Sequence, residues 1–147
     1  MKSILVLGAG RSCSTLIKRL LDRSEACGWK VVVGDIDLSV AQQKVSGHER
    51  GETFQLSALD NIERDKRIGE ADLVMSMVPA FLHASVAKVA IAAGVPVITP
   101  SYLNDEMMSL DEVAKEAGVL VLNEIGLDPG IDHMSAMKVI DEIKSDG

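Results

Sequence analysis

Short apolar runs alternate with segments of helical periodicity along the whole chain, and this alternation restricts the fold more than any other feature of the sequence. The apolar runs cover residues 2–7, 31–33, 53–56, 73–77, 95–99 and 119–122. Between and after them the pattern predicts helices over 12–21, 38–45, 62–68, 82–93, 105–117 and 133–144. Strands that are apolar throughout are typical of a parallel sheet covered on both faces. We therefore predict an α/β fold, a doubly wound Rossmann-type parallel sheet.

The composition is that of one globular domain. The chain has 147 residues, of which 47% are hydrophobic, and this is enough to bury a core without disulfides or metal ions. The net charge of -7 and the lack of a basic stripe argue against a nucleic-acid partner. No apolar segment is long enough to span a bilayer, so we expect no membrane partner.

The amino terminus and the cysteines indicate a reducing cytoplasm. The apolar residues 4–7 are followed by glycine and Arg11 without a small-residue cleavage site, which favours a buried strand over a signal peptide. Cys13 and Cys27 belong to no CxxC motif and no Cys/His cluster. We therefore expect neither a disulfide framework nor structural zinc.

A glycine motif, Gly8-Ala9-Gly10-Arg11-Ser12-Cys13, lies between the first predicted strand and the first predicted helix. Gly8 allows a tight turn, and Gly10 lets the backbone approach a pyrophosphate beside the free N–H groups of the helix terminus. Cys13 replaces the third glycine of the usual fingerprint. The motif favours dinucleotide binding, although a glycine pair of this kind also occurs in simple turns.

Asp35 follows the second apolar run, where an acid in Rossmann domains accepts hydrogen bonds from the adenosine ribose. Such a carboxylate would repel a 2′-phosphate, and Ile36 offers no positive charge to attract one. The sequence therefore predicts NAD rather than NADP as the cofactor. The alternative is that Asp35 and Asp37 only cap a solvated loop.

Two further loops follow predicted strands, at the edge where parallel sheets bind ligands. Val78 and Pro79 begin the first loop, and His83 lies further along it as either a catalytic group or a solvent-facing helix start. The second loop covers residues 123–133, where two glycines and a proline predict a sharp backbone path. Asp128, Asp132 and His133 crowd its end, but no second histidine or cysteine cluster supports a metal site, and Asp132 also suits a helix cap.

Three segments carry a family resemblance. Residues 126–137 read GLDPGIDHMSAM, residues 99–118 read TPSYLNDEMMSLDEVAKEAG, and residues 76–88 read SMVPAFLHASVAK. In this order they resemble saccharopine dehydrogenases of the glutamate-forming type. In that family a Rossmann domain precedes a larger substrate domain. The resemblance therefore implies that residues 1–147 are an NAD(P)-binding domain, truncated before the substrate domain, and that the helix at about 133–144 leads toward that domain.

The resemblance implies an oxidoreductase that acts on the CH–NH bond of saccharopine. The product imine is cleaved by water to glutamate and aminoadipate semialdehyde, and the 147-residue chain alone is expected to be inactive. The implied substrate contacts are Ser101, Tyr102 and Asp128, of which Tyr102 and Asp128 are the catalytic candidates, although Tyr102 equally suits a half-buried loop position. The implied cofactor contacts are Gly8, Gly10, Arg11, Ser12, Cys13, Asp35, Ile36, Asp37, Ser57, Ala58, Val78, Pro79, Leu127, Pro129 and Gly130.

Two departures from the family pattern bear on the cofactor. Family members often carry aspartate where this chain has Ser57, and fungal relatives that use NADP have arginine where it has Ile36. The second departure again favours NAD.

Other functions stay open. A carboxynorspermidine dehydrogenase-like enzyme shares the GxDPG element, although the DHMSAM continuation favours saccharopine. A non-catalytic NAD-binding domain is a third alternative. A homodimer is compatible with the sequence, which does not determine the oligomeric state.

Overall fold

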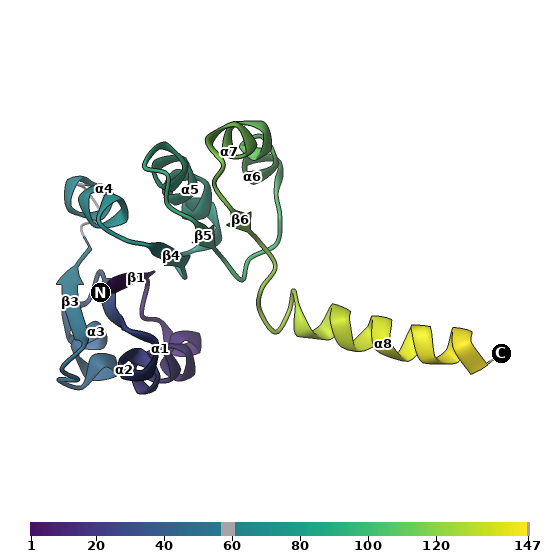
Figure 1. Ribbon diagram of the computed structural model, residues 1–147, viewed down its shortest axis with the longest axis horizontal. Helices are drawn as coiled ribbons and strands as arrows, with labels where there is room; N and C mark the ends of the chain where they lie inside the picture. Colours follow the sequence, from purple (N-terminus) through teal and green to yellow (C-terminus); the bar gives the residue numbers. More distant parts are fainter. Residues whose placement is uncertain (57–60, 147) are drawn as a thin grey trace.

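A computed structural model describes residues 1–56 and 61–146 of the chain. Six parallel strands form one sheet in the order β3-β2-β1-β4-β5-β6 (Figure 1). This is the strand order of the doubly wound Rossmann fold, so the predicted fold is confirmed. The strands are β1 (Lys2–Leu7), β2 (Trp29–Asp35), β3 (Gly51–Gln55), β4 (Leu73–Ser76), β5 (Val97–Ile98) and β6 (Val121–Leu122).

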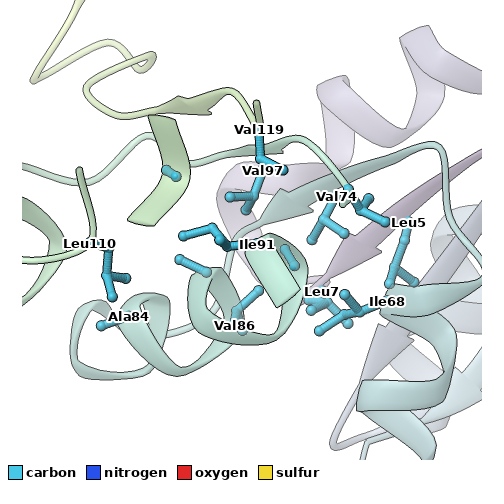
Figure 2. Packing of buried hydrophobic residues seen from close by; sticks show 14 of the residues in the cluster. Leu5, Leu7, Ile68, Val74, Ala84, Val86, Ile91, Val97, Leu110 and Val119 are labelled. Carbon is cyan, nitrogen blue, oxygen red and sulfur yellow. The ribbon is translucent and has the colours of Figure 1, made fainter. Parts of the chain in front are cut away.

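Helices cover both faces of the sheet because successive side chains of a strand point in opposite directions. In β1, Ile4 and Val6 pack in one apolar cluster, while Leu5 and Leu7 belong to a second cluster on the other face (Figure 2). The first cluster includes residues of α1 (Ser14–Asp22) and α3 (Leu38–Val45). The second cluster includes residues of α4 (Ile62–Gly69), α5 (His83–Ala92), α6 (Asp105–Met108) and α7 (Asp111–Ala117).

The structure changes several predicted boundaries. The second strand begins at Trp29 because its residues pair in register with β1 from Lys2 onward. The predicted helix 105–117 is divided into α6 and α7, and Leu110 between them stays buried in the same cluster as Met107 and Ala114. The short elements not predicted are α2 (Ser24–Cys27) and two 3-10 turns, η1 (Arg11–Cys13) and η2 (Ala80–Leu82).

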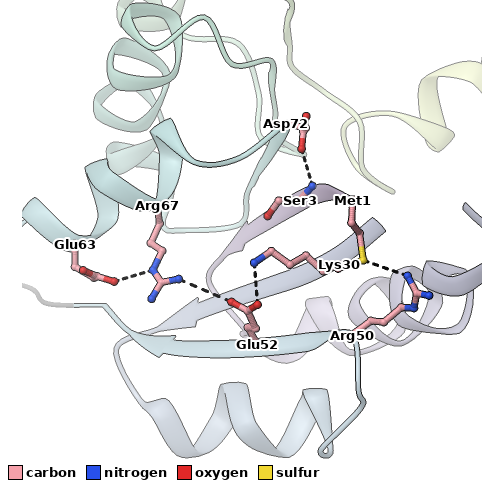
Figure 3. A network of polar contacts seen from close by, with 8 residues as sticks. All are labelled: Met1, Ser3, Lys30, Arg50, Glu52, Glu63, Arg67 and Asp72. Carbon is pink, nitrogen blue, oxygen red and sulfur yellow. Dashed lines mark hydrogen bonds and ion pairs between the residues drawn. The ribbon is translucent and has the colours of Figure 1, made fainter. Parts of the chain in front are cut away.

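A polar network joins β2, β3 and α4 near the start of the sheet (Figure 3). Lys30 Nζ lies 2.8 Å from Glu52 Oε1, and Arg67 lies 3.9 Å from Glu52 and 2.7 Å from Glu63. These groups are partly exposed, so each pair contributes little stability. Their location leaves the opposite, carboxyl edge of the strands to the loops that form the site.

The last helix, α8 (Ile131–Asp146), extends away from the sheet, and every residue of it is exposed (Figure 1). Its exposed apolar side chains include Met134, Met137, Ile140 and Ile143. They recur every three residues, so they wind around the helix and do not form one stripe. Within the described residues no helix is long and apolar enough to cross a membrane.

Candidate functional site at the carboxyl edge of the sheet

The loops that follow β1, β4, β5 and β6 meet at one edge of the sheet. Strand order reverses between β1 and β4, and ligands of doubly wound sheets bind in the crevice at this point. A cleft of about 930 Å³ opens here. It is lined by Ser12, Leu16, Met75, Met77, Ala80, Ile98, Thr99, Pro100, Ser101, Tyr102, Asn104, Ile125, Gly126, Leu127, Asp128 and Pro129.

The glycine motif forms the wall of the crevice beside β1. Gly8 has φ +97°, and a Cβ there would lie 2.6 Å from the carbonyl oxygen of Met77, so both conformation and space require glycine. At Gly10 a Cβ would meet nothing within 4 Å, so the backbone at the start of η1 and α1 is open to a ligand. Cys13 stands in for the third glycine, is 1% exposed, and has a thiol pKa raised by its burial.

The acids at and just after the end of β2, Asp35 and Asp37, are both engaged by the chain itself. Asp35 Oδ2 accepts a hydrogen bond from the N–H of Ala9 at 2.6 Å, and its Oδ1 accepts from the N–H of Asp37 at 2.9 Å. Asp37 caps α3 by accepting from Ser39 N at 2.9 Å and from its hydroxyl at 2.6 Å, and these bonds lower the pKa of Asp37. Asp35 therefore ties the glycine motif to the end of β2.

The turn before α8 presents Leu127 and Asp128 to solvent. Gly126 N donates to the carbonyl of Pro129 at 2.8 Å, and the Asp128–Pro129 peptide bond is cis. A Cβ at Gly130 would lie 2.3 Å from the Gly126 carbonyl oxygen, so the close backbone path requires glycine there. Asp132 lies in the first turn of α8, where its carboxylate accepts from the N–H of Gly130 at 2.9 Å.

Tyr102 and Asp128 meet across the mouth of the cleft. The Tyr102 hydroxyl donates to Asp128 Oδ1 at 2.5 Å, and Tyr102 is 57% exposed. The carboxylate holds the phenolic proton and therefore raises the pKa of Tyr102. A ligand in the cleft would therefore meet a carboxylate and a protonated phenol side by side at the cleft mouth.

His83 lies behind this wall of the cleft. It is 3% exposed, with Nδ1 2.8 Å from Ser76 Oγ and Nε2 2.7 Å from Ser101 Oγ. Burial lowers the pKa of His83 and so favours the neutral ring. His83 does begin α5, as the sequence suggested, but the expectation that it faces solvent is wrong. The signal that could have revealed the network is the polar residue at the end of each neighbouring strand, Ser76 and Thr99.

The structure brings some predicted site residues together and leaves others apart. The cleft lining includes Ser12, Ser101, Tyr102, Leu127, Asp128 and Pro129. The predicted residues outside the lining are Gly8, Gly10, Arg11 and Cys13 in the adjoining loop, Asp35, Ile36 and Asp37 after β2, Val78 and Pro79 after β4, and Gly130 behind the turn. Ser57 and Ala58 lie outside the described residues.

Sequence reasoning missed several lining residues. Met75 in β4 and Met77 just after it pack against the cluster that includes α1. Ile98 lies in β5, and Asn104 caps α6. Within residues 1–56 and 61–146, no three His, Cys, Asp or Glu side chains are grouped as a metal site. Of the three metal ligands considered from the sequence, the structure brings Asp132 and His133 together, with His133 Nδ1 3.0 Å from Asp132 Oδ1.

The strand order and the crevice at its reversal point define a dinucleotide-binding domain of the Rossmann class. The family model of the saccharopine dehydrogenase NADP binding domain matches residues 4–122. The chain therefore belongs to this family, as the resemblance predicted.

Similar proteins agree with this assignment. A saccharopine dehydrogenase [NADP(+), L-glutamate-forming] of Pyricularia oryzae is 40% identical over 99% of the chain, and an alpha-aminoadipic semialdehyde synthase of Arabidopsis thaliana is 36% identical over 95% of it. The chain covers 32% and 15% of these two relatives. The solved apo saccharopine dehydrogenase (L-Glu forming) of Saccharomyces cerevisiae matches with a TM-score of 0.86 and 34% identity, over 99% of this chain and 32% of that one.

The prediction of NAD over NADP is wrong. The matching family model describes an NADP-binding domain, and the fungal relatives are named as NADP(+) enzymes. In the structure Asp35 accepts hydrogen bonds from two backbone N–H groups, so its carboxylate has a structural role in the loop. Two cations lie near the start of α1, and of these the sequence indicated Arg11 but not Lys44. Arg11 is exposed in the glycine motif, and Lys44 reaches from α3 to hydrogen-bond Ser14 at the start of α1.

Proposed function

We propose that the protein containing this chain is an NADP-dependent saccharopine dehydrogenase. In this reaction saccharopine, NADP⁺ and water give glutamate, aminoadipate semialdehyde, NADPH and a proton. The carbon–nitrogen bond of the secondary amine is oxidised to an imine, and water then cleaves it. The observation that carries the proposal is the family match together with the polar pair at the cleft, Tyr102 and Asp128.

The glycine motif fits a dinucleotide. Gly10 has no neighbour within 4 Å of its Cβ position, which leaves the backbone accessible where a pyrophosphate would approach. Gly10, Arg11 and Ser12 would hold the pyrophosphate, and Arg11 and Lys44 supply positive charge for a 2′-phosphate. The bound nicotinamide would accept the hydride, so the chain itself must orient the two reactants.

The substrate side of the site is formed by three neighbouring polar residues. Asp128 accepts a hydrogen bond from the Tyr102 hydroxyl with one oxygen, and its exposed carboxylate can also accept a hydrogen bond from the substrate nitrogen. Asp128 would then receive a proton from the water that attacks the imine. Tyr102, whose one phenolic proton is donated to Asp128, would accept a hydrogen bond from that water through its oxygen, and Ser101 would bind beside them.

The substrate also requires groups from outside the described residues. Saccharopine carries three carboxylates, and such anions are usually bound by arginine or lysine. Among the described residues that line the cleft there is no arginine or lysine. We propose that these cations come from a substrate domain such as the longer relatives contain. The same domain would cover α8, whose apolar side chains face solvent on several sides.

The experiment is an assay of the purified full-length gene product with saccharopine and NADP⁺. We expect saccharopine-dependent formation of NADPH, and Asp128→Asn should lower kcat strongly while the protein stays folded. A matched control is Asp111→Asn, which changes an exposed acid at the start of α7, away from the cleft. Turnover of an unrelated amine in place of saccharopine would refute the proposed substrate.

We also propose a reducing compartment such as the cytoplasm, because both cysteines are free. Imaging of a tagged protein in its native cell would test the compartment. A homodimer is a separate proposal, and light scattering of the full-length product would test it.

A further inference from the structure

A network of hydrogen-bonded polar side chains lies behind the cleft. Ser76 at the end of β4, His83 at the start of α5 and Thr99 after β5 are 1%, 3% and 3% exposed. Ser76 Oγ lies 2.8 Å from His83 Nδ1, and His83 Nε2 lies 2.7 Å from Ser101 Oγ. Ser101 in turn lines the cleft, so the hydrogen-bond network extends from the core to the site.

The imidazole of His83 determines the direction of these hydrogen bonds. Burial lowers its pKa and favours the neutral ring, which has one N–H donor and one acceptor nitrogen. The two ends of the ring therefore cannot have the same role. If Nδ1 accepts, then Nε2 donates, and the reverse also holds.

Ser76 settles which of the two arrangements is favoured. Within the described residues His83 is the hydrogen-bond partner of its hydroxyl, so the Ser76 proton has one acceptor, Nδ1. A buried hydroxyl that loses its acceptor is strongly disfavoured. Ser76 therefore donates to Nδ1, which places the ring proton on Nε2, and Nε2–H donates to Ser101 Oγ. The hydroxyl proton of Ser101 is then left to point into the cleft.

Thr99 does not compete for this arrangement. Its Oγ1 lies 3.3 and 3.2 Å from the two ring nitrogens, so these contacts are longer and weaker than the 2.8 and 2.7 Å contacts of Ser76 and Ser101. Thr99 Oγ1 also accepts a hydrogen bond from the backbone N–H of Ser101 at 3.3 Å. This bond holds the Ser101 backbone while His83 orients its side chain.

We propose that Ser76 and His83 are positioning residues that fix the Ser101 hydroxyl as a hydrogen-bond donor into the cleft. The adjoining subsite then takes an acceptor, a carboxylate or carbonyl oxygen, and rejects an ammonium group. This inference rests on the proposed function, in which the acceptor is a carboxylate of saccharopine. It adds the polarity of the subsite and the residues that determine it.

The kinetic test is a double-mutant cycle in the full-length enzyme with saccharopine and NADP⁺. Ser101→Ala should lower kcat/KM by about tenfold, mainly through a higher KM, because it removes a hydrogen bond to a charged group. Ser76→Ala should lower it by about threefold in the wild type, since the ring proton is then no longer fixed. In the Ser101→Ala background, Ser76→Ala should change kcat/KM less than about 1.5-fold, because there is no hydroxyl left to orient.

Two further comparisons separate positioning from folding. His83→Gln, whose amide N–H can replace Nε2–H, should keep more activity than His83→Leu. Ser24→Ala removes another buried hydroxyl, remote from the cleft on α2, and should leave kcat/KM unchanged. An equal loss from Ser76→Ala in both backgrounds would mean that the network supports the fold alone, and would overturn the inference.

A second measurement does not depend on the substrate. Nitrogen-15 NMR of the histidine-labelled full-length protein reports which ring nitrogen of His83 carries the proton, with His83→Gln used to assign the signal. A proton on Nε2 supports the inference, and a proton on Nδ1 overturns it. If the wild type shows no saccharopine-dependent NADPH, the proposed function fails, and the NMR result still decides the direction of the hydrogen bonds.

Discussion

Two glycines of one motif should respond in opposite ways to the same added methyl group. Gly8 has φ +97°, and its Cβ position lies 2.6 Å from the Met77 carbonyl oxygen and 2.9 Å from the Met77 carbonyl carbon. Gly10 has φ −58° and ψ −178°, with nothing within 4 Å of its Cβ position. Alanine can adopt the conformation of Gly10 but is strained at Gly8.

The magnitudes follow from these distances. The positive φ of Gly8 costs alanine about 1–3 kcal/mol, and displacing the backbone at Met77 costs about 1–3 kcal/mol more. Gly8→Ala should therefore lower the free energy of unfolding by about 2–6 kcal/mol. Gly10→Ala should leave it unchanged or raise it by about 0.5–1 kcal/mol, because the unfolded chain loses freedom.

The assay is urea denaturation of the 147-residue chain, followed by the fluorescence of its single tryptophan, Trp29. A loss of about 2–6 kcal/mol should move the midpoint of Gly8→Ala down by roughly 1–3 M of urea, for an m-value of about 2 kcal/mol/M. NADPH titration of the full-length protein supplies the second measurement. Gly10→Ala should weaken binding about tenfold while the fold is kept, and Gly10→Val should weaken it further.

The reasoning would be refuted by either of two results. If Gly8→Ala unfolds within about 0.5 kcal/mol of the wild type, the close approach to Met77 does not constrain the motif. If folded Gly10→Val binds NADPH as the wild type does, then the motif is only a turn, and the open space at Gly10 is unrelated to the cofactor.

Three further predictions concern the rest of the site. Asp35→Asn should lower the free energy of unfolding by about 1–2 kcal/mol and weaken NADPH binding, because its amide cannot accept from two backbone N–H groups; unchanged unfolding and binding would contradict this. Tyr102 is the single tyrosine of the chain, so a spectrophotometric titration should give a pKa above the ordinary 10.0, and Asp128→Asn should return it toward that value; equal titration of both proteins would contradict the contact. The 147-residue chain alone should show no saccharopine-dependent NADPH formation even at high concentration, and robust turnover would mean that its site is complete.

The sequence predicted the sheet well because buried parallel strands are apolar throughout. Such a strand can be recognised from its own residues, without knowledge of the strand that it pairs with. It predicted the edge strands less well. Of the predicted run 119–122, only Val121 and Leu122 pair with β5. Pairing depends on the neighbouring strand, and the hydropathy of a run does not contain that information. The division between α6 and α7 was missed for a similar reason, since both halves keep the same apolar side against the core.

The candidate site was predicted in part. The glycine motif and the turn at Asp128 have local signatures, because glycine and proline restrict the backbone wherever they occur. The engagement of Asp35 by Ala9 joins residues 26 positions apart, and Lys44 reaches Ser14 across 30 positions. Neither contact has a local signature, so the sequence alone did not indicate them.

The sequence by itself determined the class of fold, the order of its elements and the motifs that recur in its family, because these depend on local periodicity and on residues of restricted conformation. The tertiary structure alone decided what the polar groups do. It showed Asp35 as a backbone anchor, Tyr102 bonded to Asp128, and His83 buried between two serines. The physical reason is that the role of a polar group depends on its partners and its burial, and folding supplies both from distant parts of the chain.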